Sequence, residues 1–286
     1  MTAQELPAGA CDCHVHVVGD VATYPMVLER QYTPAPAPHE ALQGHLQRNG
    51  LQRAVLIQPS FYGTDNRCLL DSLARLNGAG RGVAVIAEGS DAQALSALHD
   101  AGVRGLRVNV ESAGMRDPAL VQEMLQRWAR RLAPWGWHLQ LYAAHTTIAQ
   151  LARVLGSLPV PTVLDHFAML PAETRLDDPT ASSIIELVGK GNAYIKLSAP
   201  YRIAGEDAIA ASAPLARAFI EAHPGRVLWG SDWPHTNREP GKQALEVSRY
   251  RDITPGSLTD SMFQWLPTPA LREQVLVENP ARLYGF

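Results

Sequence analysis

The chain lacks the features that mark several large classes of protein. Its 286 residues hold 25 lysines and arginines against 28 aspartates and glutamates, so the basic excess of a nucleic-acid-binding protein is absent. No apolar run approaches the roughly 20 residues that a membrane span needs, and the first residues have neither the basic nor the apolar segment of a signal peptide. We therefore expect no nucleic-acid partner, no membrane association and a cytoplasmic protein.

Cysteine is also scarce. The three cysteines, Cys11, Cys13 and Cys68, cannot form a disulfide framework, and we interpret them as buried free thiols in a reducing compartment. Charged residues make up 19% of the chain and hydrophobic residues 46%, which is the composition of an ordinary globular protein. This composition argues against disorder, and a chain of this length can bury a large core.

Short β-rich runs recur along the sequence, and their starts lie on average 31 residues apart. That spacing is about the length of one strand–helix unit. The eight runs are Ala10–Val18, Arg53–Pro59, Arg81–Ile86, Val103–Asn109, Trp137–Ala143, Pro161–Phe167, Ala193–Pro200 and Val227–Pro234. Segments with helical features follow several of them, at Ala92–Ala101, Pro118–Ala133, Ala144–Leu155, Ala211–His223 and Thr268–Leu283.

Strands that alternate with helices imply a parallel sheet with right-handed crossovers. Eight such units predict closure, so we expect an α/β protein with a single (β/α)8 TIM barrel domain over residues 1–286. An open doubly wound sheet is the structural alternative, and the absence of a GxGxxG motif after the first run disfavours its dinucleotide-binding form. The proline-rich stretch from Thr33 to Pro38 is expected to be a rigid connector or a substrate lid over the first strand.

Ionisable residues gather at the ends of the predicted strands, where barrel enzymes keep their active sites. His14 and His16 are two residues apart on the first strand and share a face, where they could grip a divalent metal or hydrogen-bond one substrate oxygen. His166 ends the sixth strand, and Asp232 ends the eighth, where it could act as a general base or a metal ligand. The structural alternatives are satisfied buried histidines and an aspartate that caps the next helix.

Other polar residues at the same predicted ends suit an organic acid. Arg107 and Asn109 share a face of the fourth strand, and an inward arginine can hold a carboxylate with two parallel hydrogen bonds. Arg202 follows the seventh strand, Ser60 follows the second and Tyr142 ends the fifth. For Arg107 the structural alternative is an ion pair within the protein.

Together these motifs resemble the amidohydrolase superfamily, and within it the 2-pyrone-4,6-dicarboxylate lactonases. The resemblance is carried by the histidine pair of the first strand, by Asp165-His166, by the block Gly230 to His235, and by shorter matches at 32–34, 65–67, 101–107 and 278–284. It implies a (β/α)8 barrel that hydrolyses a cyclic ester in the bacterial degradation of aromatics. By this resemblance Asp232 activates water and His14, His16 and His166 surround the carbonyl under attack. The residues expected to contact substrate are Arg107, Arg202, Tyr32, Ser60, Asn109, Tyr142 and His235.

The resemblance also bears on metal use. Many superfamily members have a histidine at the tip of the fifth strand, whereas His138 stands at the start of that strand here. The pyrone lactonases share this feature and are understood to work without a required metal, so we expect no required cofactor. The alternative is one divalent metal such as zinc on His14, His16, His166 and Asp232, in a metal-dependent hydrolase or decarboxylase of a related organic acid. A non-catalytic barrel that binds an organic acid is the alternative from another class.

One departure from that family concerns the substrate. The lactonases place an arginine after the histidine of the sixth strand and another a few residues beyond the arginine of the fourth, whereas Phe167 and residues 109–114 stand here. A dicarboxylate wants a cation at each carboxylate. We therefore expect a small carboxylate or lactone substrate, either 2-pyrone-4,6-dicarboxylate or a related lactone. The oligomeric state is not set by the sequence.

Overall fold

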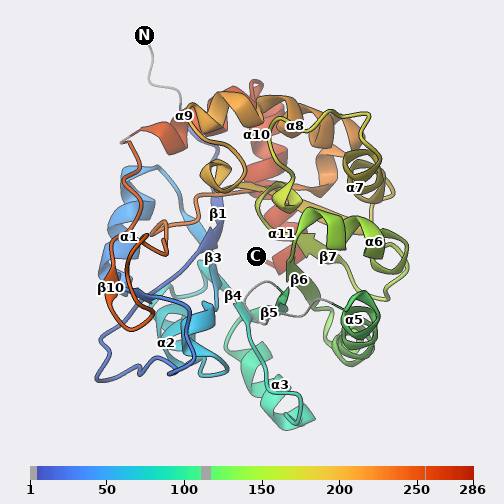
Figure 1. Cartoon of the computed structure of the whole chain (residues 1–286). Helices are drawn as coiled ribbons and strands as arrows, with labels where there is room; N and C mark the ends of the chain where they lie inside the picture. The colour runs from blue at the N-terminus through green and yellow to red at the C-terminus, as the bar shows by residue number, and fades with distance from the viewer. Residues whose placement is uncertain (1–4, 111–116, 255) are drawn as a thin grey trace.

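Eight parallel strands form the inner ring of the computed structural model, which describes residues 5–110, 117–254 and 256–286 (Figure 1). In ring order the strands are β1 (Cys11–Val15), β3 (Arg53–Ile57), β4 (Gly80–Ala84), β5 (Val103–Asn109), β6 (His138–Tyr142), β7 (Thr162–Leu164), β8 (Ala193–Ser198) and β9 (Val227–Gly230). The ring closes just beyond β9, where the His16 amide donates to the Trp233 carbonyl at 2.8 Å and the Asp232 amide to the His14 carbonyl at 2.9 Å. The predicted (β/α)8 TIM barrel is confirmed.

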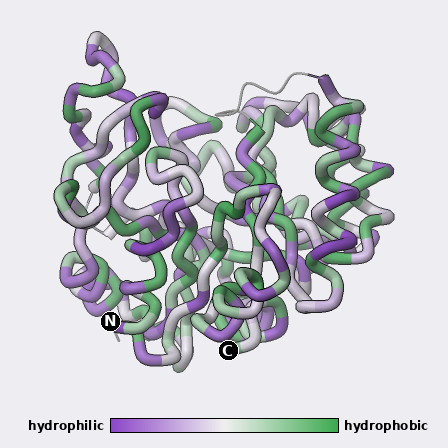
Figure 2. Tube along the Cα trace, turned by 90° about the horizontal axis from the view of Figure 1, so that it is seen from below, coloured by the Kyte–Doolittle hydropathy of each residue, from purple (hydrophilic) through white to green (hydrophobic). Residues whose placement is uncertain are grey.

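Helices form the outer ring (Figure 1). They are α1 (His39–Arg48), α2 (Arg67–Arg75), α3 (Ala92–Asp100), α5 (Pro118–Leu132), α6 (His145–Leu155), α7 (Pro179–Gly189), α8 (Ala208–Ala222), α9 (Ser257–Trp265), α10 (Pro269–Glu273) and α11 (Asn279–Tyr284). Hydrophilic and hydrophobic residues alternate along them in Figure 2, as expected for helices with one face on a core. Asp91 and Asp117 cap α3 and α5 by accepting backbone hydrogen bonds.

The last predicted helix differs from the structure. Thr268–Leu283 is not continuous, because a π-helical turn at Gln274–Glu278 separates α10 from α11. Pro280 has no N–H to donate to the preceding turn, which fits a wider turn at this point. None of the helices in the described residues is long and apolar enough to cross a membrane.

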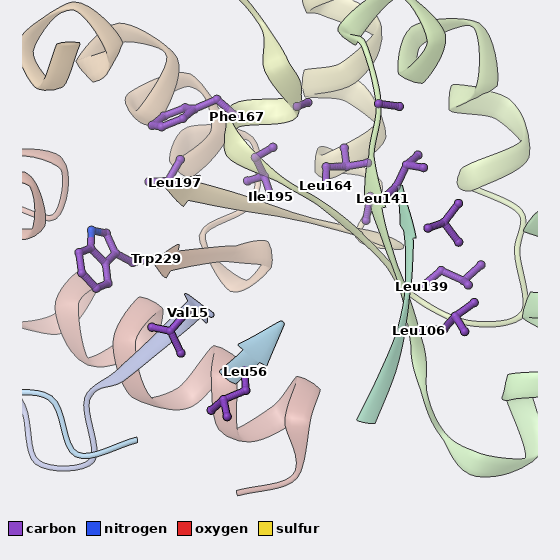
Figure 3. Close-up of a cluster of buried hydrophobic side chains, with 14 of the residues drawn as sticks. Val15, Leu56, Leu106, Leu139, Leu141, Leu164, Phe167, Ile195, Leu197 and Trp229 are labelled. Carbon is purple, nitrogen blue, oxygen red and sulfur yellow. The ribbon is translucent and has the colours of Figure 1, made fainter. Parts of the chain in front are cut away.

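The hydrophobic core has two layers, one on each side of the barrel wall. Leu56, Leu139, Leu197 and Trp229 belong to the outer layer, between the strands and the helices (Figure 3). A smaller cluster with Cys11, Cys13, Ile57, Val163, Tyr194 and Leu228 is closed by Tyr284 of the last helix. The barrel is therefore filled with mostly apolar side chains at that level, whereas the polar side chains of the candidate site lie nearer the carboxyl ends of the strands.

A bulge in β1 aims the histidines inward. Cys11 and Cys13 face the inner cluster, whereas Val15 belongs to the outer one, and the pairing with β3 shifts register between Asp12 and Val15. Strict alternation after Cys13 would send the next side chain outward. The bulge reverses this phase, so that His14 and His16 share the inner face.

A small parallel sheet ties two long loops together near the barrel mouth. β2 (Thr33–Pro34) lies in the predicted proline-rich connector and pairs with β10 (Val247–Ser248), far away in the sequence. The Thr33 hydroxyl also donates to the Ala244 carbonyl at 2.8 Å. In Figure 1 β10 lies beside α1, next to the loop that follows β1.

Candidate active site

A cavity of about 220 Å³ opens at the carboxyl ends of the strands. Nine of the residues predicted from the sequence line it: His16, Tyr32, Ser60, Arg107, Asn109, Tyr142, His166, Arg202 and Asp232. His14 lies fully buried against this set. His235 does not line the cavity; its Nδ1 lies 3.3 Å from the Tyr201 hydroxyl. A larger hollow of about 570 Å³ between α8 and α9 contains none of the three site histidines.

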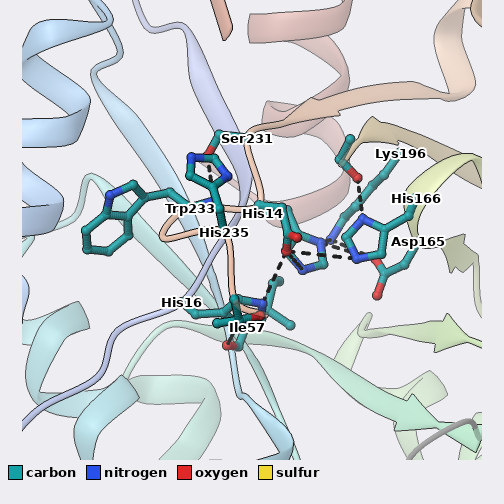
Figure 4. Close-up of polar contacts among 12 residues, drawn as sticks. His14, His16, Ile57, Asp165, His166, Lys196, Ser231, Trp233 and His235 are labelled. Carbon is teal, nitrogen blue, oxygen red and sulfur yellow. Dashed lines mark hydrogen bonds and ion pairs between the residues drawn. The ribbon is translucent and has the colours of Figure 1, made fainter. Parts of the chain in front are cut away.

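Three imidazoles converge on one oxygen of Asp232. The Nε2 atoms of His14, His16 and His166 lie 3.6, 3.5 and 4.0 Å from Asp232 Oδ1 (Figure 4). The distances are too long for good direct hydrogen bonds. The four groups thus surround a point that a water, a substrate oxygen or a cation could occupy.

The neighbours of two imidazoles constrain where their protons lie. His16 Nδ1 is 2.7 Å from the Ile57 carbonyl, which can only accept, so His16 carries a proton on Nδ1. A neutral His16 therefore presents a lone pair to the cavity. His166 Nδ1 is 2.8 Å from the Ser198 hydroxyl, which can donate or accept, so the protonated nitrogen of His166 can be either one.

A fully buried polar layer supports the histidines from inside the barrel. Lys196 of β8 donates to the Gln140 side-chain oxygen at 2.8 Å and lies 3.3 Å from His14 Nδ1. Its Nζ is also 3.4 Å from Asp165 Oδ1, while the other oxygen of Asp165 accepts from the Gln140 amide at 3.0 Å. Burial raises the pKa of Asp165, but Lys196 and His14 outweigh it and hold that pKa well below its usual range. Burial lowers the pKa of Lys196 against the effect of Asp165.

Asp232 is fixed through its second oxygen. Oδ2 accepts from Arg202 at 2.7 Å and from the Tyr201 hydroxyl at 2.7 Å, which leaves Oδ1 to face the imidazoles. Burial raises the pKa of Asp232, but the Arg202 guanidinium, followed by His166, outweighs burial and keeps the pKa well below its usual value. Burial lowers the pKa of His14 strongly and that of His166 to about 4, so both are neutral at pH 7.

The strand ends that carry the site are conformationally strained. Asp232 has φ 63°, and the segment from His166 to Met169 has four successive positive φ values near 50–55°. A left-handed conformation costs roughly 1–2 kcal/mol for each residue with a side chain. Such strain is retained where the surrounding structure enforces it, which is common at functional sites.

A second buried network holds β1 and β9 in register. Asp12 Oδ1 accepts from the backbone amides of Ser231 and His14 at 2.9 and 3.1 Å, and Oδ2 lies 3.0 Å from His45 Nε2 of α1. At Gly230 a Cβ would come within 2.7 Å of His14 Cβ, so only glycine permits this approach. These contacts set His14 opposite Asp232.

Sequence reasoning did not assign a role to several residues of this region, among them Lys196, Gln140, Tyr201, Arg238 and Arg251. The period-2 rule places Lys196 and Ser198 on one face of β8, as it places Gln140 and Tyr142 on one face of β6, and this signal could have found the first two. Arg238 and Arg251 line the cavity from the long loop after β9, where no periodicity indicates which way a side chain points.

The residues present fit one divalent metal. His14 Nε2 and Asp232 Oδ1 are buried and lack a hydrogen-bond partner among the described residues. His14, His16 and Asp232 bring their ligand atoms together, with His166 Nε2 4.0 Å from Asp232 Oδ1, and imidazole nitrogens with a carboxylate suit zinc. His14, Asp165 and His166 form a second group of metal-ligating type, but Lys196 already supplies a positive charge there.

A closed α/β barrel with histidines and an aspartate at its strand ends defines the architecture of the amidohydrolase-type enzymes. The sequence matches the amidohydrolase family over residues 11–286, and the chain belongs to that family. The predicted family resemblance is confirmed.

Relatives with known names align with nearly the whole length of this chain. A 2-pyrone-4,6-dicarboxylate hydrolase of Comamonas testosteroni is 33% identical, over 98% of this chain and 91% of the relative. A 4-sulfomuconolactone hydrolase of Hydrogenophaga intermedia is 31% identical, over 98% and 90%. A crystal structure from Acinetobacter baumannii, described as a probable 2-pyrone-4,6-dicarboxylic acid hydrolase with citric acid bound, has a TM-score of 0.81 at 26% identity, over 97% of this chain and all of that one.

Proposed function

We propose that this protein hydrolyses a carboxylated lactone, 2-pyrone-4,6-dicarboxylate or a related cyclic ester. The observation that carries the proposal is the convergence of three imidazoles on Asp232 Oδ1 in a cavity lined by arginines. The substrates in the relatives' names are lactones that also bear acidic groups, and the structural neighbour holds the polycarboxylate citric acid.

In the proposed mechanism Asp232 accepts the proton of the attacking water. Its low pKa keeps it ionised at neutral pH, and the hydrogen bonds to Oδ2 aim Oδ1 at the reacting centre. Because Asp232 is a weak base, its contribution comes from orientation more than from basicity. The proton then passes to the leaving oxygen of the opened ring.

The developing oxyanion needs a hydrogen-bond donor. When the Ser198 hydroxyl donates to His166 Nδ1, His166 Nε2 carries the proton and can donate while the ring stays neutral. One such donor is typically worth ~10²–10³ in rate. His16 cannot donate from Nε2 unless it is doubly protonated, so it serves to accept from the attacking water. In the metal-dependent alternative, an ion held by His14, His16, His166 and Asp232 would polarise the carbonyl and acidify the water.

Chelator treatment separates the two versions of the proposal. We expect enzyme stripped of metal, and checked for residual metal, to consume 2-pyrone-4,6-dicarboxylate, as followed by loss of the pyrone ultraviolet band. Activity that returns only with added zinc or manganese would favour the metal-dependent version. No consumption under either condition, tested also with sulfomuconolactone, would overturn the proposal.

Arg107 is expected to act mainly in substrate binding. Its Nη1 donates to the Gln58 carbonyl at 2.9 Å, and its buried Nε has no partner among the described residues. Arg107→Met should raise KM about 10-fold or more and change kcat little, because a charge-assisted bond of about 1.5–3 kcal/mol is lost. The control is Arg175→Met, whose side chain is 82% exposed. An unchanged KM in Arg107→Met would remove this residue from the binding site.

A further inference from the structure

The cavity carries more positive charge than the reaction centre needs. Four arginines line it, Arg107, Arg202, Arg238 and Arg251, whereas Asp232 is the single carboxylate among its described lining residues. Arg202 forms an ion pair with Asp232 at 2.7 Å, whereas Arg107 donates to the Gln58 carbonyl, which is neutral and leaves its charge uncompensated. Three positive charges, those of Arg107, Arg238 and Arg251, are therefore available to anionic groups of a ligand.

Arg251 is oriented before any ligand binds. Its guanidinium lies over the Tyr201 ring, 4.9 Å from the centroid, and its backbone amide donates to the His235 carbonyl at 2.9 Å. Tyr201 is held in turn by Asp232. The Arg251 Nε is buried without a hydrogen-bond partner among the described residues, although it can donate one bond. The next residue, Asp252, lines the outer hollows and not this cavity.

Hydrogen bonds join the two ends of the loop segment between Arg238 and Arg251. Glu239 pairs with Arg249 through hydrogen bonds of 2.5 and 3.0 Å, so the residue after Arg238 is joined to a residue just before Arg251. The β2–β10 pairing fixes the same loop to the segment that follows Tyr32. The backbone segments that carry Arg238 and Arg251 are thus joined to each other, and both residues line the cavity, Arg238 from an exposed position.

We propose that Arg251 and Arg238 hold a second anionic group of the substrate, a carboxylate or sulfonate, while Arg107 serves the other end. The inference rests on the proposed lactonase function for the identity of the reacting end. It assigns the substrate to dianionic lactones. Both arginines of this clamp belong to the loop after β9. They differ in sequence position from the two arginines of the lactonases, which are replaced here by Phe167 and by a residue within 109–114.

Binding of inert dianions tests the clamp without requiring turnover. Benzene-1,3-dicarboxylate and 3-sulfobenzoate carry two anionic groups on a six-membered ring, and benzoate carries one. We expect calorimetric titration of the full-length protein to give at least ~10-fold tighter binding of one dianion than of benzoate. Whichever of the two dianions binds more tightly shows whether the second anionic group of the substrate is a carboxylate or a sulfonate. Arg251→Gln and Arg238→Gln should each reduce this preference severalfold and the double variant should abolish it, with benzoate affinity changed less than about 2-fold.

Lys242→Gln is the matched control, since Lys242 is an exposed cation on the same loop that does not line the cavity. It should keep the full preference for the dianion. Equal affinities for mono- and dianions in the unmodified protein, or an unchanged preference in the double variant, would overturn the clamp. A clamp that persists in a protein unable to open any tested lactone would overturn the proposed reaction and leave this inference standing.

Discussion

Replacing Asp232 with asparagine is expected to lower kcat by ~10²–10⁴-fold, the range for loss of a general acid–base group. Asparagine keeps the shape of the side chain and can still accept from Tyr201 and Arg202, whose bonds to Oδ2 are both 2.7 Å. It cannot take a proton from water. Circular dichroism should show an intact fold, while a lower melting temperature would reflect the lost charge opposite the mostly buried Arg202.

Asp252→Asn provides the comparison for this variant. Asp252 is exposed, follows the same loop and lies outside the cavity, so this replacement should leave both kcat and KM unchanged. Full activity in Asp232→Asn would eliminate Asp232 as the base. The same rate loss in both variants would point to a general effect of this region on the structure.

The fold could be predicted from the sequence because each strand–helix unit repeats at a nearly constant spacing. Each of the eight runs from Ala10 to Pro234 overlaps one barrel strand, although β4 begins one residue before its run and most strands are shorter than their runs. Asp165 and Asp232 belong to the predicted runs but lie just beyond the ends of β7 and β9, at Leu164 and Gly230. The site residues therefore had to be located from the ionisable side chains near the strand ends, because β-propensity alone does not mark where a strand stops.

Site residues could be predicted where the periodicity of a single strand determines which way a side chain points. They could not be predicted where a contact joins the ends of two different strands. The HxH spacing correctly placed His14 and His16 on one face, but only the bulge in β1 makes that face the inner one. Arg202 was expected to meet substrate, whereas its closest contact is Asp232, on a different strand end. His235, expected to contact substrate, does not line the cavity, and its Nδ1 lies 3.3 Å from the hydroxyl of Tyr201, which donates to Asp232.

Lys196 is expected to be the most sensitive residue that does not line the cavity. The Lys196→Met variant leaves Asp165 as a buried carboxylate without its cation, and breaking a buried pair typically costs about 3–5 kcal/mol. His14 also loses a neighbour at Nδ1, so kcat should fall by ~10–100-fold, as for other residues that orient a catalytic imidazole. Urea unfolding and steady-state kinetics measure the two effects separately.

A double replacement distinguishes the charge pair from the packing of the side chain. If Lys196 acts by compensating Asp165, then Lys196→Met combined with Asp165→Asn should cost less than the sum of the two single changes, by about 1–3 kcal/mol. Strict additivity would instead mean that Lys196 contributes through its volume. Lys190→Met is the control on the surface, since Lys190 pairs with Glu186 at 2.7 Å while both side chains are about two-thirds exposed. Solvent screens such a pair, so the control should unfold at the same urea concentration as the unmodified protein.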